Sequence, residues 1–230
     1  MNRYTLLIAL FLASAGAKAQ DVWEKPDSDD ATEQTARNGQ QEKKVREAEN
    51  KDAKYMAGAV PEKDGKVAWT FSFNVPGRSA QEIYDTTLKR MKAFTRQENQ
   101  LEGSAVALVN KKEHSIVVTA AEWMVFRDSF LSLDRAKFFY TLIFNITDGH
   151  ISVSMERLYY RYDDNNGRGE YKISAEESIS DRNGLNKKQT KLVPGWAKFR
   201  RKTVDRVDEV EKYIRKIGLQ LAKAGNGTTK

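Results

Sequence analysis

Apolar and polar residues alternate along several stretches after residue 66, as in strands that bury one face. The first stretch has an apolar residue at every second position: Val67, Trp69, Phe71, Phe73 and Val75. Pro76-Gly77 ends it. Two more strands are expected over 105–109 and 115–125, joined by a polar turn over 110–114. A further pair follows, with alternation over 138–146, the turn dipeptide Asp148-Gly149, and a return strand from Ile151.

The return strand changes phase after Met155. The apolar positions before the change are Ile151, Val153 and Met155, and those after it are Leu158, Tyr160 and Tyr162. One extra residue in a strand shifts the alternation in this way and bends the sheet. We therefore expect a β-bulge near Glu156 or Arg157.

Two helices complete the pattern. Ser79 and Glu82 form a capping box that predicts a helix start, and this helix extends to about Arg96. A long helix is expected from an N-cap at Thr203, because apolar residues recur at helical spacing: Val204, Val207, Val210, Ile214, Ile217 and Leu221. The order β-α-β-β-β-β-α predicts an α+β fold, a curved antiparallel sheet with both helices on one face.

The first 66 residues differ from the rest. Residues 1–19 have a basic start at Arg3, an apolar middle and the small-x-small site Ala17-Lys18-Ala19, so we expect an export signal cleaved before Gln20. The apolar run is too short to span a membrane. Residues 20–66 are expected to be a flexible charged leader, with a frayed helix over 40–56. Residues 67–222 would form the folded domain, and residues 223–230 a disordered tail.

Charge and cysteine content narrow the chemistry. The chain has 230 residues, a formal charge of +7 and no cysteine, which excludes disulfides, thiolate nucleophiles and cysteine-bound metals. Residues 1–19 carry two of the positive charges, and residues 20–66 hold 12 acidic and 9 basic residues. The remaining residues therefore have a net charge of +8, and we expect a basic folded domain.

Two segments resemble a known family. VAWTFSFNVPGRSAQEIYDTTLKRM, from Val67, resembles the opening of domain-of-unknown-function family 4468 (DUF4468), and YKISAEESISDRNGLNKKQTKLVPGWAKFRRKTVD, from Tyr171, is similar to its closing segment. The resemblance covers about Val67 to Leu221 and implies an exported bacterial protein with a fold like that of the TATA-binding protein (TBP-like). It implies no catalytic residues. Because fold does not fix function, it does not imply DNA binding.

A search for catalytic groups finds no recognisable site. The two histidines, His114 and His150, are expected in turns, which does not make a zinc site. No Gly-x-Ser-x-Gly elbow is present. Asp163 to Gly167 has calcium-binding residue types, but its spacing indicates a hairpin turn. Glu122 and Glu156 are the acids expected within the sheet. We predict that the protein is not an enzyme and uses no cofactor or metal, with a small envelope hydrolase as the alternative.

The most basic segment is residues 186–202, which holds seven bases, no acid and two aromatic residues, Trp196 and Phe199. Clustered cations attract anions, and an aromatic ring among them can stack on a sugar. A solvated linker is the other interpretation. The residues expected to bind an anionic ligand are Lys187, Lys188, Lys191, Trp196, Lys198, Arg200, Arg201 and Lys202.

These observations favour a binding or interaction module of the bacterial envelope, periplasmic or secreted. The expected partner is an anionic glycan, a lipid or an envelope protein, and not a nucleic acid. An apolar pocket between the sheet and the last helix is a second possibility, unless its candidate residues fill the space themselves: Phe144, Met155, Tyr160, Val210 and Ile214. A third hypothesis is that residues 40–56 fold on a partner protein.

Overall fold

The computed structural model describes residues 51–129, 132–163, 167 and 169–226. The chain divides into two units, 1–46 and 47–230, and only the second contains described residues. The predicted export signal and most of the predicted leader lie outside them. The described elements are η1 (Ala53–Tyr55), β1 (Glu62–Lys63), β2 (Lys66–Val67), β3 (Trp69–Asn74), α2 (Ala80–Phe94), β4 (Ala105–Asn110), β5 (Ser115–Ser129), β6 (Ser132–Thr147), β7 (His150–Tyr162), β8 (Tyr171–Ser174), α3 (Ala175–Ser178), α4 (Asp181–Gly184) and α5 (Pro194–Asn226).

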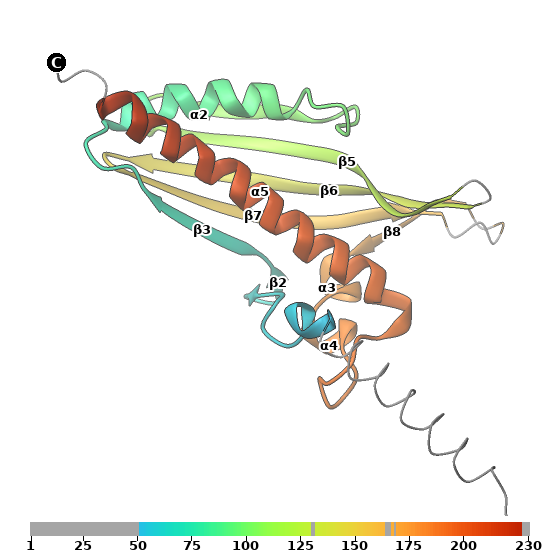
Figure 1. Ribbon diagram of the computed structural model, residues 1–230. Helices are drawn as coiled ribbons and strands as arrows, with labels where there is room; N and C mark the ends of the chain where they lie inside the picture. The colour runs from blue at the N-terminus through green and yellow to red at the C-terminus, as the bar shows by residue number, and fades with distance from the viewer. Residues whose placement is uncertain (1–50, 130–131, 164–166, 168, 227–230) are drawn as a thin grey trace, which may run out of the picture. The chain divides into compact units, whose positions relative to one another are not determined.

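The main sheet is antiparallel, as expected. Its strand order is β3-β7-β6-β5-β4, and β8 pairs with the second half of β7. Both long helices, α2 and α5, lie on the same face of this sheet (Figure 1). We call that face the inner face and the opposite one the outer face. The fold is α+β, as the sequence predicts.

The phase change in β7 is a β-bulge, as predicted. Phe139 pairs with Tyr159 and Thr141 pairs with Glu156, so Arg157 and Leu158 together stand opposite Tyr140. Arg157 has a φ of 59°, in the left-handed region that few residues other than glycine adopt. The bulge therefore turns the Arg157 side chain outward while Leu158 is buried.

The inner face and the helices form the core. All six apolar positions predicted for the last helix are buried against the sheet. The residues considered for an apolar pocket are also buried, each 1 % exposed or less, so they fill the space between sheet and helix: Phe144, Met155, Tyr160, Val210 and Ile214.

The two helix starts differ in how well they were predicted. The capping box of α2 is confirmed, since the Ser79 side chain accepts from the Glu82 amide and the Glu82 carboxylate accepts from the Ser79 amide. The expected start of α5 at Thr203 is wrong, because the helix begins at Pro194. Proline suits the first turn of a helix, where its missing N–H has no partner to lose. Thr203 lies buried within the helix, and its hydroxyl contacts the Tyr160 hydroxyl at 2.6 Å.

Residues 51–66 correct the expected domain boundary at Val67. Residues Asp52 to Val60, which we call the N-terminal strap, pack against α5 and α4. Arg201 donates to both carboxylate oxygens of Asp52 at 2.7 Å, and Lys54 pairs with Asp205 and Asp208. Val60 is 3 % exposed and belongs to the core. The domain therefore begins before residue 60.

The sequence analysis missed β8, α3 and α4. Ser174 caps α3 with the same Ser-x-x-Glu capping box as α2, here with Glu177. Strands β7 and β8 are antiparallel, and the segment 163–167, expected to be a hairpin turn, lies mostly outside the described residues. At the other end, α5 runs to Asn226, into the region expected to be a disordered tail. No helix among the described residues has the length and apolar character needed to cross a membrane.

Candidate ligand-binding site

The structure does not gather the predicted basic segment into one site. Arg200 is completely buried. It pairs with Asp181 at 2.6 Å and donates to the backbone carbonyls of Tyr55, Met56 and Ile179. The guanidinium nitrogens bind groups of the N-terminal strap and of the α3–α4 region, and they thereby hold both to α5. Arg200 is thus a structural residue that no external ligand can reach.

Lys198 and Arg201 are also occupied within the fold. Lys198 pairs with Asp134 at 2.7 Å, donates to the Tyr162 hydroxyl at 2.6 Å, and lies 4.3 Å from the centre of the Tyr162 ring. Burial lowers the pKa of Lys198, but hydrogen bonds to Asp134 and Tyr162 outweigh it, so the net pKa shift is upward. Arg201 is held by Asp52 of the strap.

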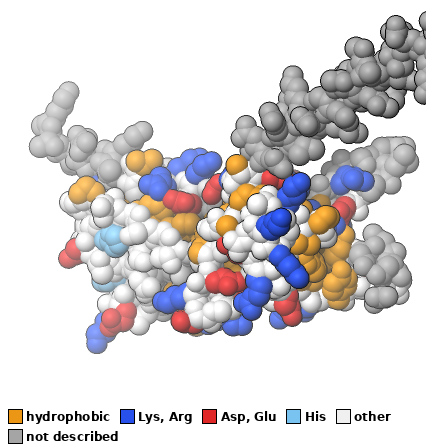
Figure 2. Space-filling model, turned by 90° about the horizontal axis from the view of Figure 1, so that it is seen from below, with side chains coloured by type: hydrophobic (Ala, Val, Ile, Leu, Met, Phe, Trp, Pro, Cys, Tyr) orange, Lys and Arg blue, Asp and Glu red, His pale blue; other side chains and the backbone are white. Residues whose placement is uncertain are grey.

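The remaining predicted residues are dispersed. Lys187, Lys188 and Lys191 are exposed in the connection between α4 and α5, and Lys202 is exposed on α5. Trp196 packs edge-on against Phe199, with ring centres 5.8 Å apart. Seen from below, basic side chains lie among acidic and hydrophobic ones (Figure 2). The exposed bases of the segment are thus divided between the α4–α5 connection and α5, apart from the three that the fold uses.

The acids that motivated the hydrolase alternative do not converge. Glu122 is 2 % exposed and binds Arg206 through both oxygens, at 2.7 and 2.8 Å, with Asn99 and Gln100 as further donors. Burial alone would lower the pKa of Arg206, but its bonds to Glu122 raise it well above its ordinary value. Glu156 lies on the outer face, where it lines a different cavity. Glu122 is consequently neither a free acid nor a free base.

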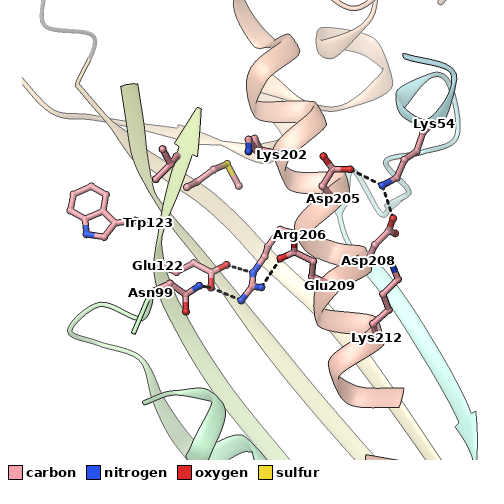
Figure 3. A pocket seen from close by; sticks show the side chains of 12 residues that line it. Lys54, Asn99, Glu122, Trp123, Lys202, Asp205, Arg206, Asp208, Glu209 and Lys212 are labelled. Carbon is pink, nitrogen blue, oxygen red and sulfur yellow. Dashed lines mark hydrogen bonds and ion pairs between the residues drawn. The ribbon is translucent and has the colours of Figure 1, made fainter. Parts of the chain in front are cut away.

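Glu122 and Arg206 lie in a cavity of about 490 Å³ between β5 and α5. Figure 3 shows the two side chains facing each other, with Lys54 reaching both Asp205 and Asp208. Most of the charges in this cavity therefore neutralise one another. His114 and His150 contact neutral side chains only, Gln81 for the first and Ser72 and Asn74 for the second. Among the described residues, no three His, Cys, Asp or Glu side chains form a possible metal site.

The outer face holds a different cluster of cations, built by strand pairing. Lys137 on β6 stands directly opposite Arg161 on β7, and Arg161 directly opposite Lys172 on β8. Like charges placed opposite each other on neighbouring strands destabilise a sheet. One carboxylate, that of Glu170, pairs with Lys137 at 3.1 Å. Three strands thus carry a row of like charges that is only partly compensated.

Aromatic rings lie beside this row. The Phe139 and Tyr159 rings stack in parallel, with centres 4.5 Å apart. Lys172 lies 4.3 Å from the centre of the Tyr159 ring, and the Arg135 guanidinium lies 3.7 Å from that of Trp123. We call these residues the outer-face site: Trp123, Arg135, Lys137, Phe139, Tyr159, Arg161 and Lys172.

Three of the four cations of the outer-face site, all but Lys137, lie against rings and have no acidic partner among the described residues. In the described part of the chain, Arg135, Arg161 and Lys172 make no ion pair with a carboxylate. When a guanidinium stacks on a ring, its N–H donors lie in the plane of the guanidinium and point to the sides, where an anion can bind them. The site is therefore an ordered set of rings and exposed cations, most of which have no acidic partner among the described residues.

Comparisons with known proteins agree with the fold. A family described as "Domain of unknown function (DUF4468) with TBP-like fold" matches residues 69–161. The crystal structure of a DUF4468 family protein from Bacteroides ovatus is 38 % identical over 73 % of this chain and 94 % of that chain, with a TM-score of 0.67. The chain belongs to the DUF4468 family. The crystal structure of a TBP-like protein from Parabacteroides distasonis also resembles this protein in fold. The two are 18 % identical, the match covers 70 % of this chain and 97 % of that chain, and the TM-score is 0.54.

The family match confirms the resemblance and the TBP-like fold expected for this DUF4468 protein. No curated protein matches the chain. The matched region, 69–161, contains the strands β3 to β7 and so includes most of the outer-face site. Sequence reasoning missed this site because it considered basic residues that are neighbours in sequence. The available signal was the outward phase of the strands, which carries Lys137 and Phe139 on β6 and Tyr159 and Arg161 on β7.

Proposed function

We propose that this DUF4468 protein is a non-enzymatic binding module that is exported from the cell and binds an anionic glycan through the outer-face site. The observation that carries the proposal is the row of cations opposite one another on three strands, Lys137, Arg161 and Lys172. A sheet tolerates such repulsion at a cost, and a bound polyanion would relieve it.

The neighbouring rings favour a glycan over a simple anion. The faces of the Tyr159 and Trp123 rings are covered by Phe139, Lys172 and Arg135, but the ring edges can pack against the apolar face of a sugar while the cations beside them bind acidic groups. Rings and cations lie side by side across β5, β6, β7 and β8, so a chain of sugar units can contact rings and bind cations along its length. An extended polymer therefore suits the site better than a small ion.

The test is binding of the purified mature protein to polygalacturonate, with neutral dextran and phosphatidylglycerol vesicles beside it. We expect binding to polygalacturonate that weakens at high salt, because salt screens exposed charges within about 10 Å at 0.1 M. The variant Arg135→Ala/Arg161→Ala should raise Kd by at least about tenfold, since each loses a charge-assisted contact. Isothermal titration calorimetry measures both values.

The matched control is Lys187→Ala/Lys188→Ala, which removes two exposed positive charges outside the outer-face site. Its Kd should stay within about twofold of the parent value. Equal losses in the two variants would show non-specific attraction and contradict the proposal. Binding to the anionic vesicles alone would replace the glycan with a lipid surface.

A further inference from the structure

Arg157 is the residue of the β7 bulge, and it adopts a backbone conformation that suits glycine better than arginine. Its φ of 59° is unfavourable for an arginine, whereas glycine or asparagine adopts such angles readily. The bulge itself needs an extra residue at this point, but not a large charged one. A smaller residue would satisfy the backbone at lower cost.

No contact within the described structure holds the Arg157 side chain. It is 74 % exposed, and its nearest charged group is the carboxylate of the adjacent Glu156, at 3.7 Å. That separation is too long for a hydrogen bond. The guanidinium therefore adds little to the stability of the fold that would offset the backbone strain.

Arg157 does line a cavity. This cavity has a volume of about 680 Å³, within the range of small-ligand sites, and it lies between the β1–β2 hairpin and the bulge. Asp64 lines it too, from the Asp64-Gly65 turn of the β1–β2 hairpin, where a positive φ is the ordinary turn conformation. Strained backbone such as that at Arg157 collects at ligand sites, and bulges often redirect a side chain toward one.

The cavity is continuous with the outer-face site. Tyr159 and Lys172 line the cavity and also belong to that site. Leu158 adds an apolar part, and Lys63 and Lys66 add positive charge from the hairpin. The lining also holds three carboxylates, those of Asp64, Glu156 and Glu176, so the cations exceed the acids by one. A ligand lying along the outer-face site therefore meets the cavity at the edge of the Tyr159 ring.

We propose that Arg157 is the specificity-determining residue of this cavity, where it binds the carboxylate of one acidic sugar unit of the glycan. The guanidinium fork matches a carboxylate with two parallel hydrogen bonds, and the Tyr159 ring forms a wall against which the sugar packs. The inference rests on the proposed function, because it assigns one unit of the same ligand to a defined position. It explains why a strained arginine occupies the bulge.

The test compares Arg157→Gly and Arg157→Asn with the parent protein, using galacturonate oligosaccharides as the probe. Both replacements suit the left-handed backbone and remove the charge. We expect Kd to rise by at least about tenfold in both, with Tm unchanged or raised by about 2–4 °C as strain is relieved. Gln189→Gly is the matched control, because Gln189 also has positive φ, at 55°, and lies away from the cavity. It should leave Kd unchanged.

The outcomes separate the two proposals. Loss of binding in both Arg157 variants, with native Tm and normal binding by Gln189→Gly, would support the inference. Equal binding by the parent and the Arg157 variants would overturn it and leave the outer-face site intact. Loss in Arg157→Gly alone would assign the effect to the backbone and would also overturn it. Failure of the parent protein to bind any acidic glycan would overturn the proposed function itself.

Discussion

Arg200 shows how a charged side chain can belong to a protein core. Its guanidinium is completely buried, but it faces one carboxylate, that of Asp181, and three backbone carbonyls. A buried charge is tolerated only where its donors are satisfied and its charge is compensated. The carbonyls come from residues 55, 56 and 179, so the same side chain satisfies groups from two separate segments.

Replacing Arg200 should therefore damage stability and not binding. We expect Arg200→Ala to lower the free energy of unfolding by about 3–5 kcal/mol, because Asp181 and the carbonyls lose their partner inside the protein. Guanidinium chloride denaturation measures this value. Lys188→Ala, on the exposed α4–α5 connection, should change it by less than about 0.5 kcal/mol. A loss below about 1 kcal/mol for Arg200→Ala would contradict the role assigned to this residue.

The sequence does not separate Arg200 from its basic neighbours. Arg200, Arg201 and Lys202 are consecutive, and a charge run is ordinarily a solvated face. The acceptors of Arg200 are mainly backbone carbonyls, which leave no side-chain signal in the sequence. Its burial is set by the N-terminal strap and by α4, neither of which the hydrophobic pattern predicts.

At the scale of elements, the start of α2 offers a test in which pH has a defined direction. Glu82 accepts hydrogen bonds from the Ser79 amide and hydroxyl, which lower its pKa below the usual value of a glutamate. Because the pKa is lower in the folded state, the stabilisation is present at neutral pH. It is lost as the pH falls through the folded-state pKa.

Ser79→Ala should consequently reduce Tm by about 2–4 °C at pH 7, and by less at an acidic pH below the folded-state pKa of Glu82. Circular dichroism melting at the two pH values measures the difference. Lys89→Ala, at an exposed position of the same helix, serves as the control and should change Tm little at either pH. A deficit that grows on acidification would show that the Glu82 carboxylate has no part in the cap.

The elements that the sequence predicted are those with clear periodicity. Alternation located β3 and the β6–β7 hairpin, and the phase change located the bulge at Arg157. The expected N-cap at Thr203 left Pro194 unused, although proline often begins a helix, and so the first turns of α5 were missed. β8 has four residues and no long alternation to mark it. Ser174 and Glu177 did carry a capping signal for α3, which the sequence analysis overlooked.

At the scale of the whole molecule, the N-terminal strap determines where the folding unit begins. A chain that starts at Val67 would lack the carbonyls of Tyr55 and Met56 that Arg200 binds, and would lack the buried Val60. We expect it to be less stable than a chain that starts at Glu47 by about 3 kcal/mol or more, since hydrogen bonds to charged groups contribute about 1.5–3 kcal/mol each. Urea denaturation of both chains measures this. Equal midpoints would show that the strap is dispensable.

The outer-face site also depends on the whole molecule, which limited its prediction. Its cations become neighbours only through the register of β6, β7 and β8, and the register of β7 changes at the bulge. The sequence predicted the bulge but not β8, so the position of Lys172 relative to Arg161 could not be derived. The expected ligand class, an anionic glycan, is retained in the proposal at a different place on the protein.

The strap also has a consequence for the order of folding during synthesis. Arg200 and Tyr55 are separated by 145 positions, and Asp52 and Arg201 by 149. Contacts over such separations form late, because a long loop must close first. The strap is made early, but the partners of its charged and polar groups, α4 and α5, are made last. A chain crossing a membrane N-terminus first would thus stay incomplete until nearly its last residues had passed, and only then close around Arg200.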